Sequence, residues 1–140
     1  SDDVRYGDDN FVYSHDKDSI PCIKTLKLND IPDDIIIKTD IILINEGQFF
    51  SDLIEFCINW AEKFDKKIIV AGLDGDFKQI PFTNSKMLEL IPYASKVEKL
   101  LAKCYLCQND APFTKRMVIS DSKILIGGED EYQPCCSKHL

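Results

Sequence analysis

Four candidate metal ligands stand near the end of this 140-residue sequence as two close-spaced pairs. The first pair is Cys104 and Cys107; after 28 intervening residues comes the second, Cys136 and His139. Thiolate sulfur and imidazole nitrogen are the ligands of tetrahedral zinc sites, and four protein ligands leave no open position for a substrate. The spacing therefore predicts a structural zinc ion, which would compensate for the small core of a C-terminal lobe.

The remaining cysteines do not fit this pattern. Cys135 could compete with Cys136 as a ligand, but three residues separate it from His139, where the spacing of a zinc knuckle needs two. Cys22 and Cys57 have no partner at metal spacing, and we interpret them as core or bystander thiols. Closely spaced metal ligands are typical of reducing compartments, so we expect an intracellular, cytoplasmic protein.

Upstream of the metal ligands, a strand, helix, strand pattern indicates an α/β fold. From Asp40, the segment DIILINE contains four consecutive apolar residues, which predicts a strand buried on both faces, as in a parallel sheet. Ser51 is placed to cap a helix whose apolar residues recur at spacings of three and four from Leu53 to Phe64. The run IIVAG, residues 68–72, predicts a second buried strand at the distance of a right-handed crossover.

The flanking segments are less regular. Residues 1–34 are rich in turn residues, which predicts loops with short elements. After the second strand, LDGDFKQIPF mixes turn residues with aromatics, and the segment from Thr83 begins like a capped helix that Pro92 ends or kinks. The last forty or so residues are typical of a small β-rich lobe organised by metal. We place the boundary between the two domains after residue 101.

Composition limits the partners. The chain has 24 acidic and 17 basic residues, a net charge of −7, which disfavours nucleic acid and anionic membranes as partners. No apolar stretch approaches the ~20 residues of a membrane span. The acidic start, SDDVRYGDDN, lacks the pattern of a secretory signal. A hydrophobic content of 44% supports a folded core.

Four segments, taken together and in this order, resemble the type II (zinc-containing) thymidine kinases of cells, viruses and bacteria: NEGQFFSDLIEFC, IIVAGLDGDFKQIPF, CYLC followed by FTKR, and IGGEDEYQPCCSKH. The likeness runs from about Asp3 to the last residues. It implies a RecA-like P-loop α/β domain, partly contained in residues 1–101, and a zinc-ribbon "lasso" lobe at residues 102–140. It also implies transfer of the γ-phosphate of ATP to the 5′-hydroxyl of thymidine, giving dTMP, in a homotetramer with dTTP as a feedback ligand.

The resemblance assigns chemistry to three residues. Glu46 becomes the catalytic carboxylate at the end of a central strand, where it can take the proton of the attacking 5′-hydroxyl. Asp3 and Arg5 match a segment near the reacting phosphates, where the planar donors of an arginine stabilise charge. The alternative for Glu46 is an exposed loop glutamate. We assign no chemistry to His15.

The resemblance also implies a nucleoside pocket. Gln48 and Phe49 would help to shape it, Leu73, Phe77 and Phe82 would add apolar walls, and the lasso would contribute Thr114, Gly127, Gly128 and Tyr132. A planar thymine buries well between apolar side chains, and glycines let main-chain groups approach a ligand. Without the resemblance, the aromatic residues would more simply be core and the two glycines an ordinary hairpin turn. The neighbouring Lys115 and Arg116 would be surface or phosphate-side charges.

The sequence departs from the family pattern at two points. Asn45 stands where an aspartate usually holds magnesium, so a magnesium ion near Asn45 would depend on phosphates, water and other residues. No G-x-x-x-x-G-K-[ST] loop, which binds the phosphates of ATP, is found in these residues. We therefore expect the C-terminal three quarters of a kinase, preceded by about 40 to 60 residues that carry this loop, without which neither ATP binding nor phosphorylation is expected.

Two alternatives to an active kinase remain open at this point. One is a catalytically inactive thymidine-binding fragment, which Asn45 and the missing loop favour. The other is a non-catalytic zinc-ribbon interaction module. The segments EGQFF and LDGDFKQIPF would have no role in such a module.

Overall fold

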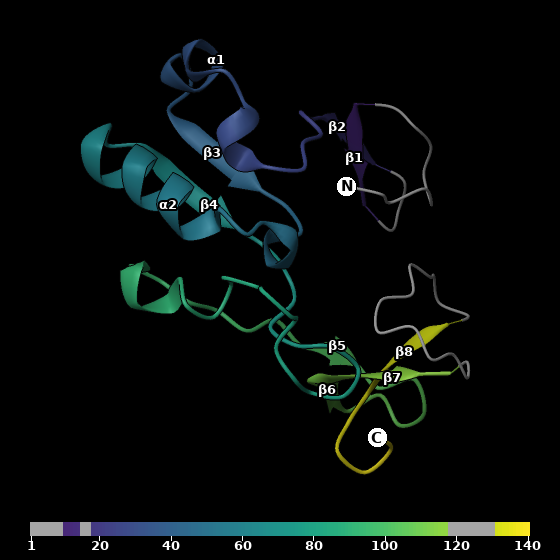
Figure 1. The fold of residues 1–140 in the computed structure, drawn as a ribbon. Helices are drawn as coiled ribbons and strands as arrows, with labels where there is room; N and C mark the ends of the chain where they lie inside the picture. Colours follow the sequence, from purple (N-terminus) through teal and green to yellow (C-terminus); the bar gives the residue numbers. More distant parts are fainter. Residues whose placement is uncertain (1–9, 15–17, 118–130) are drawn as a thin grey trace. The chain divides into compact units, whose positions relative to one another are not determined.

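The computed structural model describes residues 10–14, 18–117 and 131–140, and the chain divides into two units (Figure 1). The α/β unit is Thr25–Glu98, and the β-rich unit combines Ser1–Lys24 with Lys99–Leu140. In the part of the chain that is described, no helix has the length and apolar character needed to cross a membrane.

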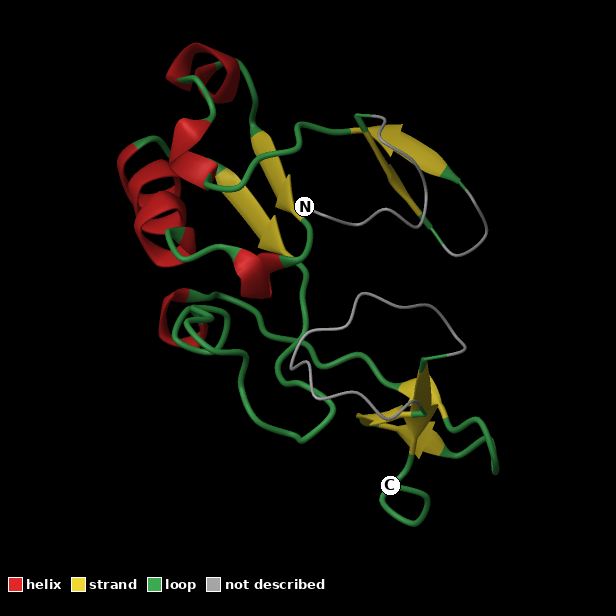
Figure 2. Cartoon of the chain, turned by 45° about the vertical axis from the view of Figure 1, so that its right-hand side comes forward, coloured by secondary structure: helices red, strands yellow, loops and turns green. Residues whose placement is uncertain are grey.

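A parallel pair of strands forms the centre of the α/β unit. Strand β3 (Ile41–Ile44) pairs with β4 (Lys67–Val70) in a register that sets Ile41 opposite Lys67 and Ile44 opposite Val70. Between them in sequence lie α2 (Leu53–Ile58) and a π-helical turn at Asn59–Lys63. Figure 2 shows α2 alongside the two strands. The predicted strand, helix, strand unit is confirmed, although the second strand ends at Val70 rather than at residue 72.

The core of this unit lies between the helices and one face of the strand pair. Leu53, Phe56 and Trp60 are almost fully buried, because their spacing of three and four places them on one side of the helical segment. They form one cluster with Ile44, Cys57, Leu28 from a short 3₁₀ helix (Leu28–Asp30) and Ile36 from α1 (Asp33–Ile37). Cys57 is thus the core thiol that the sequence predicts, and its burial raises its pKa to about 11.

The expectation that the first strand is buried on both faces is wrong. Ile44 is buried, whereas Ile41 and Leu43, which point to the opposite face, are 54% and 64% exposed. Side chains alternate between the two faces of a strand, and the cluster around α2 covers one of these faces. The apolar run therefore correctly indicates a strand but overestimates its burial.

Two predictions about helix boundaries are also wrong. Asp52, not Ser51, occupies the N-cap of α2, and its Oδ2 accepts a hydrogen bond from the Asn29 N–H at 2.9 Å instead of capping its own helix. The segment that begins at Thr83 forms turns and a short 3₁₀ helix (Ile91–Tyr93) that contains Pro92, not a longer helix. Proline lacks the N–H that a continuing α-helix would need.

The β-rich unit consists of short antiparallel pairs. These are β1 (Phe11–Tyr13) with β2 (Ser19–Pro21), β5 (Ala102–Lys103) with β6 (Asp110–Ala111), and β7 (Phe113–Arg116) with β8 (Tyr132–Cys135). Its buried cluster is Cys104, Ala111, Cys135 and Cys136. A cluster made mainly of cysteines fits the prediction of a small β lobe organised by metal.

The burial of Leu53 yields a stability prediction. Leu53→Ala should lower the free energy of unfolding by about 2–5 kcal/mol, because it leaves a cavity in a packed core. Leu26→Ala is the matched control, since Leu26 is 76% exposed and should change stability by less than about 0.5 kcal/mol. Urea unfolding followed by the fluorescence of Trp60 measures both. Equal effects of the two substitutions would contradict this assignment of the core.

Candidate functional site

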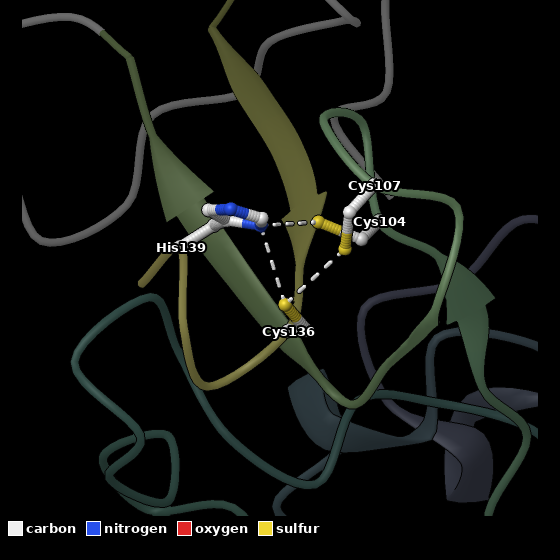
Figure 3. A group of neighbouring side chains, drawn as sticks. All are labelled: Cys104, Cys107, Cys136 and His139. Carbon is white, nitrogen blue, oxygen red and sulfur yellow. Dashed lines mark hydrogen bonds between the residues drawn. The ribbon is translucent and has the colours of Figure 1, made fainter.

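The four predicted metal ligands meet in the β-rich unit. Cys104 and Cys107 lie in the connection between β5 and β6, Cys136 directly follows β8, and His139 lies in the last turn of the chain (Figure 3). Main-chain hydrogen bonds shape both turns: Gln108 N donates to Cys104 O, and His139 N donates to Cys136 O, each at 3.0 Å. Each pair is therefore set by its own local turn.

The distances between the ligand atoms suit one tetrahedral ion. His139 Nδ1 lies 3.3 Å from the Sγ atoms of both Cys104 and Cys136, and the Sγ atoms of Cys107 and Cys136 are 3.7 Å apart. All four ligand atoms lie within 4.8 Å of one another. Zinc bonds of about 2.3 Å to sulfur and about 2.0 Å to nitrogen predict edges of about 3.8 Å and about 3.5 Å in a tetrahedron. The cluster can thus hold a metal ion, and its donor atoms favour zinc.

The thiol of Cys104 is prepared for metal binding. Its burial opposes ionisation, but hydrogen bonds from the backbone of Cys136, Leu106 and Cys107 and from the His139 side chain outweigh this effect and lower its pKa to about 5. Because the thiolate is the form that binds metal, this lowered pKa favours metal binding by Cys104.

Cys135 lies next to the cluster without belonging to it. Its side chain is fully buried, burial raises its pKa, and it is not among the four residues whose ligand atoms lie within 4.8 Å of one another. Lys115, which the sequence suggests as a surface or phosphate-side charge, donates from Nζ to His139 O at 3.0 Å. This bond connects β7 to the turn that carries His139.

A second group of predicted site residues lies in the α/β unit, at the carboxyl ends of β3 and β4. Asn45 is exposed and Glu46 is half-buried, with a left-handed backbone (φ 56°, ψ 41°) that leads into a 3₁₀ helix, Gly47–Phe49. Ala71 N donates to Ile44 O at 2.8 Å, and Gly47 N donates to Ala71 O at 2.9 Å. Pairing between the two chain segments therefore continues past the strands and holds Glu46 at the sheet edge where α/β proteins bind ligands.

Gln48 connects Glu46 to the segment after β4. Its Nε2 donates to Glu46 Oε2 at 2.6 Å, and its Oε1 accepts from Leu73 N at 2.9 Å. The side chain is 2% exposed. The resemblance assigns Gln48 only to the pocket wall, and nothing in the local sequence signals this internal bridge.

Two glycines make the close approach possible. A Cβ on Gly72 would lie 2.5 Å from Gln48 Oε1, and a Cβ on Gly47 would lie 2.5 Å from a Val70 methyl group and 3.1 Å from the sulfur of Met87. Any other residue at these two positions would collide with its neighbours. The sequence reasoning missed these two glycines, and their signal is that each stands within three residues of the end of an apolar run.

Of the predicted pocket residues in this unit, Phe49 and Phe82 are in contact. The rings of Phe49 and Phe82 meet edge to face, with centroids 5.8 Å apart, and Phe49 and Leu73 are each about half exposed. Phe77 is half-buried in the turn that connects Leu73 to Phe82. Asp76 Oδ1 shapes that turn by accepting from the N–H groups of Lys78 and Ile80, at 2.8 and 3.2 Å.

The described lasso residues belong to the β-rich unit. Thr114 on β7 pairs with Pro134, and Tyr132 on β8 pairs with Arg116, whose guanidinium lies 5.9 Å from the centroid of the Tyr132 ring. The remaining predicted residues, namely Asp3, Arg5, His15, Gly127 and Gly128, lie outside the described residues.

Known proteins are similar to this sequence along its length. A family model described as thymidine kinase matches residues 1–140. Thymidine kinase from Oryza sativa subsp. japonica is 42% identical over 141 residues, which cover 98% of this chain and 51% of that protein. Thymidine kinase a of Arabidopsis thaliana is 43% identical, with 99% and 59% covered, and thymidine kinase of Sheeppox virus (strain KS-1) is 43% identical, with 97% and 73% covered. The chain thus spans about half to three quarters of the length of these relatives.

The cluster yields a prediction about metal content. We expect one zinc ion per chain by elemental analysis. Cys136→Ala and His139→Ala should each abolish stoichiometric zinc, and removal of zinc by a chelator should unfold the β-rich unit, since metal binding contributes directly to folding. Cys135→Ala is the matched control and should keep its zinc. Loss of zinc from Cys135→Ala together with its retention in His139→Ala would contradict the ligand set.

Proposed function

The chain belongs to the thymidine kinase family, and from this premise we propose that the whole protein transfers the γ-phosphate of ATP to the 5′-hydroxyl of thymidine, producing dTMP. The observation that carries the proposal is the half-buried Glu46 carboxylate, held by Gln48 at the carboxyl ends of two parallel strands. This edge is where ligands bind in open α/β sheets.

In the proposed reaction, Glu46 acts as the general base. Its carboxylate accepts the proton of the 5′-hydroxyl while that oxygen attacks the γ-phosphorus, and the bond to the leaving ADP oxygen breaks. Phe49, Leu73 and Phe82 supply apolar surface against which thymine can be buried. The half-exposed state of Phe49 and Leu73 supports this role, because a core residue would already be covered.

The other proposed contacts follow from the family. From the lasso, Thr114 and Tyr132, with Gly127 and Gly128, would contact the nucleoside, and Phe77 would complete the apolar wall. Asp3 and Arg5 would lie near the reacting phosphates, where the guanidinium stabilises charge on the transferred group.

Two metal ions are part of the proposal. Zinc, held by the three cysteines and His139, would be structural, since four protein ligands complete its coordination. Magnesium would neutralise charge on the phosphates of ATP. Asn45 is exposed at the end of β3 and offers one neutral oxygen, so it suits a water-mediated contact better than a strong direct one.

We extend the proposal to architecture and assembly. The parallel pair of β3 and β4, joined through α2, is the connection expected inside a RecA-like P-loop sheet. Family membership supports the finer assignments: a kinase domain within residues 1–101, a zinc lobe at residues 102–140, a homotetramer, dTTP as feedback ligand and a cytoplasmic location. A second candidate, a protein that binds thymidine without turnover, is favoured by Asn45, and turnover by the wild type would exclude it.

The proposal predicts the effect of a change at Glu46. In the whole protein, Glu46→Gln should lower kcat by about 100- to 10,000-fold, because the amide cannot accept the proton. Thymidine affinity should change by less than about threefold, because the ring contacts remain. Steady-state kinetics and calorimetric titration measure the two effects. Glu55→Gln, at an exposed position on α2, is the control, and a Glu46→Gln variant with most of its kcat would remove Glu46 from the mechanism.

A second prediction concerns magnesium. Asn45→Asp should lower the magnesium concentration that half-saturates turnover, because a carboxylate binds the cation or its water more strongly than an amide does. Asn59→Asp, the same change of charge at the end of α2, should leave that concentration unchanged. A magnesium titration of all three proteins decides the point, and identical curves for Asn45→Asp and wild type would speak against a magnesium contact here.

A further inference from the structure

Gln48 is the one polar side chain that is buried in the described part of the chain. An amide removed from water costs free energy unless its hydrogen bonds are replaced. Here both ends of the amide are bonded, Nε2 to Glu46 Oε2 at 2.6 Å and Oε1 to Leu73 N at 2.9 Å. The burial of Gln48 is therefore tied to these two partners.

The chemistry of the partners determines the orientation of the amide. A main-chain N–H can only donate, and an ionised carboxylate can only accept. An amide turned by half a rotation would face Glu46 with its oxygen and Leu73 with its NH₂ group, and both bonds would be lost. Gln48 Oε1 also lies close against Gly72, since a Cβ added to that glycine would be only 2.5 Å from this oxygen.

The same contact restrains Glu46. Its backbone is left-handed, a conformation that has a cost in free energy for any residue with a side chain. The short, charge-assisted bond from Gln48 offsets part of this cost and selects one carboxylate oxygen. Among the residues that the structure describes, none donates a hydrogen bond to the other oxygen, Oε1, which can face an incoming group.

We propose that Gln48 is a positioning residue for phosphoryl transfer: it holds Glu46 Oε2 so that Oε1 faces the substrate hydroxyl, and it ties this carboxylate to the pocket wall at Leu73. The role rests on the proposed kinase function. Because only 2% of its surface is exposed, we expect Gln48 to act through Glu46 and Leu73 rather than by direct contact with the nucleoside. The distance between Leu73 in the pocket wall and the general base Glu46 is thereby kept constant. This matters because a displacement of about 1 Å can lower the rate about 100-fold.

Two substitutions at Gln48 test the proposal in the whole protein. Gln48→Glu keeps the length of the side chain and an oxygen that accepts from Leu73, but it sets a second carboxylate against Glu46. Two carboxylates at this distance share a proton, so the acidic limb of the kcat/KM profile should move up by about one pH unit or more. Gln48→Met loses both bonds without adding charge, so kcat should fall by about 10- to 100-fold while KM for thymidine changes by less than about threefold.

The controls separate positioning from a merely structural role. If Gln48 only supported Leu73, Gln48→Glu would keep that bond and its pH profile would match that of the wild type, which would overturn the proposal. Gln79→Glu adds the same charge in an exposed turn of the same unit and should leave the profile unmoved. A wild type that does not phosphorylate thymidine would instead overturn the proposed function itself.

A measurement without turnover keeps the contact testable. The melting temperature of Gln48→Glu should fall further below that of the wild type as the pH rises from 5 to 8, because both carboxylates become charged. For Gln48→Met, the difference from the wild type should be the same at each pH. A Gln48→Glu difference that does not depend on pH would show that residue 48 does not face Glu46, and the proposal would be wrong.

Discussion

The parallel, in-register pairing of β3 with β4 is the constraint on which the α/β unit depends. Parallel strands bring their carboxyl ends to one edge, so the segments that follow, residues 45–49 and 71–73, must meet there. The bonds from Ala71 to Ile44 and from Gly47 to Ala71 continue this pairing, and Gln48 reaches Leu73 as a consequence. The apolar side of α2 holds the pair from one face. The register of β3 and β4 thus determines the position of the Glu46 carboxylate.

The β-rich unit depends on a different constraint. Its strands have two to four residues, and isolated pairs of this length are marginally stable in water. Its buried cluster contains three cysteines and one alanine, which offer little apolar surface. Cys104, Cys107, Cys136 and His139 converge into a cluster that can hold a metal ion, and in the proposed zinc site metal coordination would replace that missing burial. The two units would then depend on two different sources of stability, apolar packing and metal binding.

The features that depend on local sequence could be predicted, and those that depend on contacts between distant residues could not. The metal ligands could be predicted because each pair depends on a local turn, and the strand, helix, strand unit could be predicted because its apolar period is local too. The role of Asp52 could not be predicted, because its hydrogen-bond partner Asn29 lies 23 residues away. The exposure of Leu43 could not be predicted either, because it depends on what covers the far face of the strand. The bridge through Gln48 could not be predicted either, because it joins residues 25 positions apart.

Backbone strain gives the loop at Glu46 a significance that does not depend on family likeness. Among the described residues other than glycine, positive φ angles also occur at Asp65, Gln79, Asn84 and Gln108, and all four are exposed in loops or turns where water can solvate the backbone. Glu46 differs because its left-handed backbone coincides with a half-buried carboxylate and a fully buried amide partner. Natural sequences retain such local costs mainly where geometry serves a site. Strain and burial at one point, next to the end of a parallel pair, therefore distinguish this loop from the other four and support its place at the centre of the proposed chemistry.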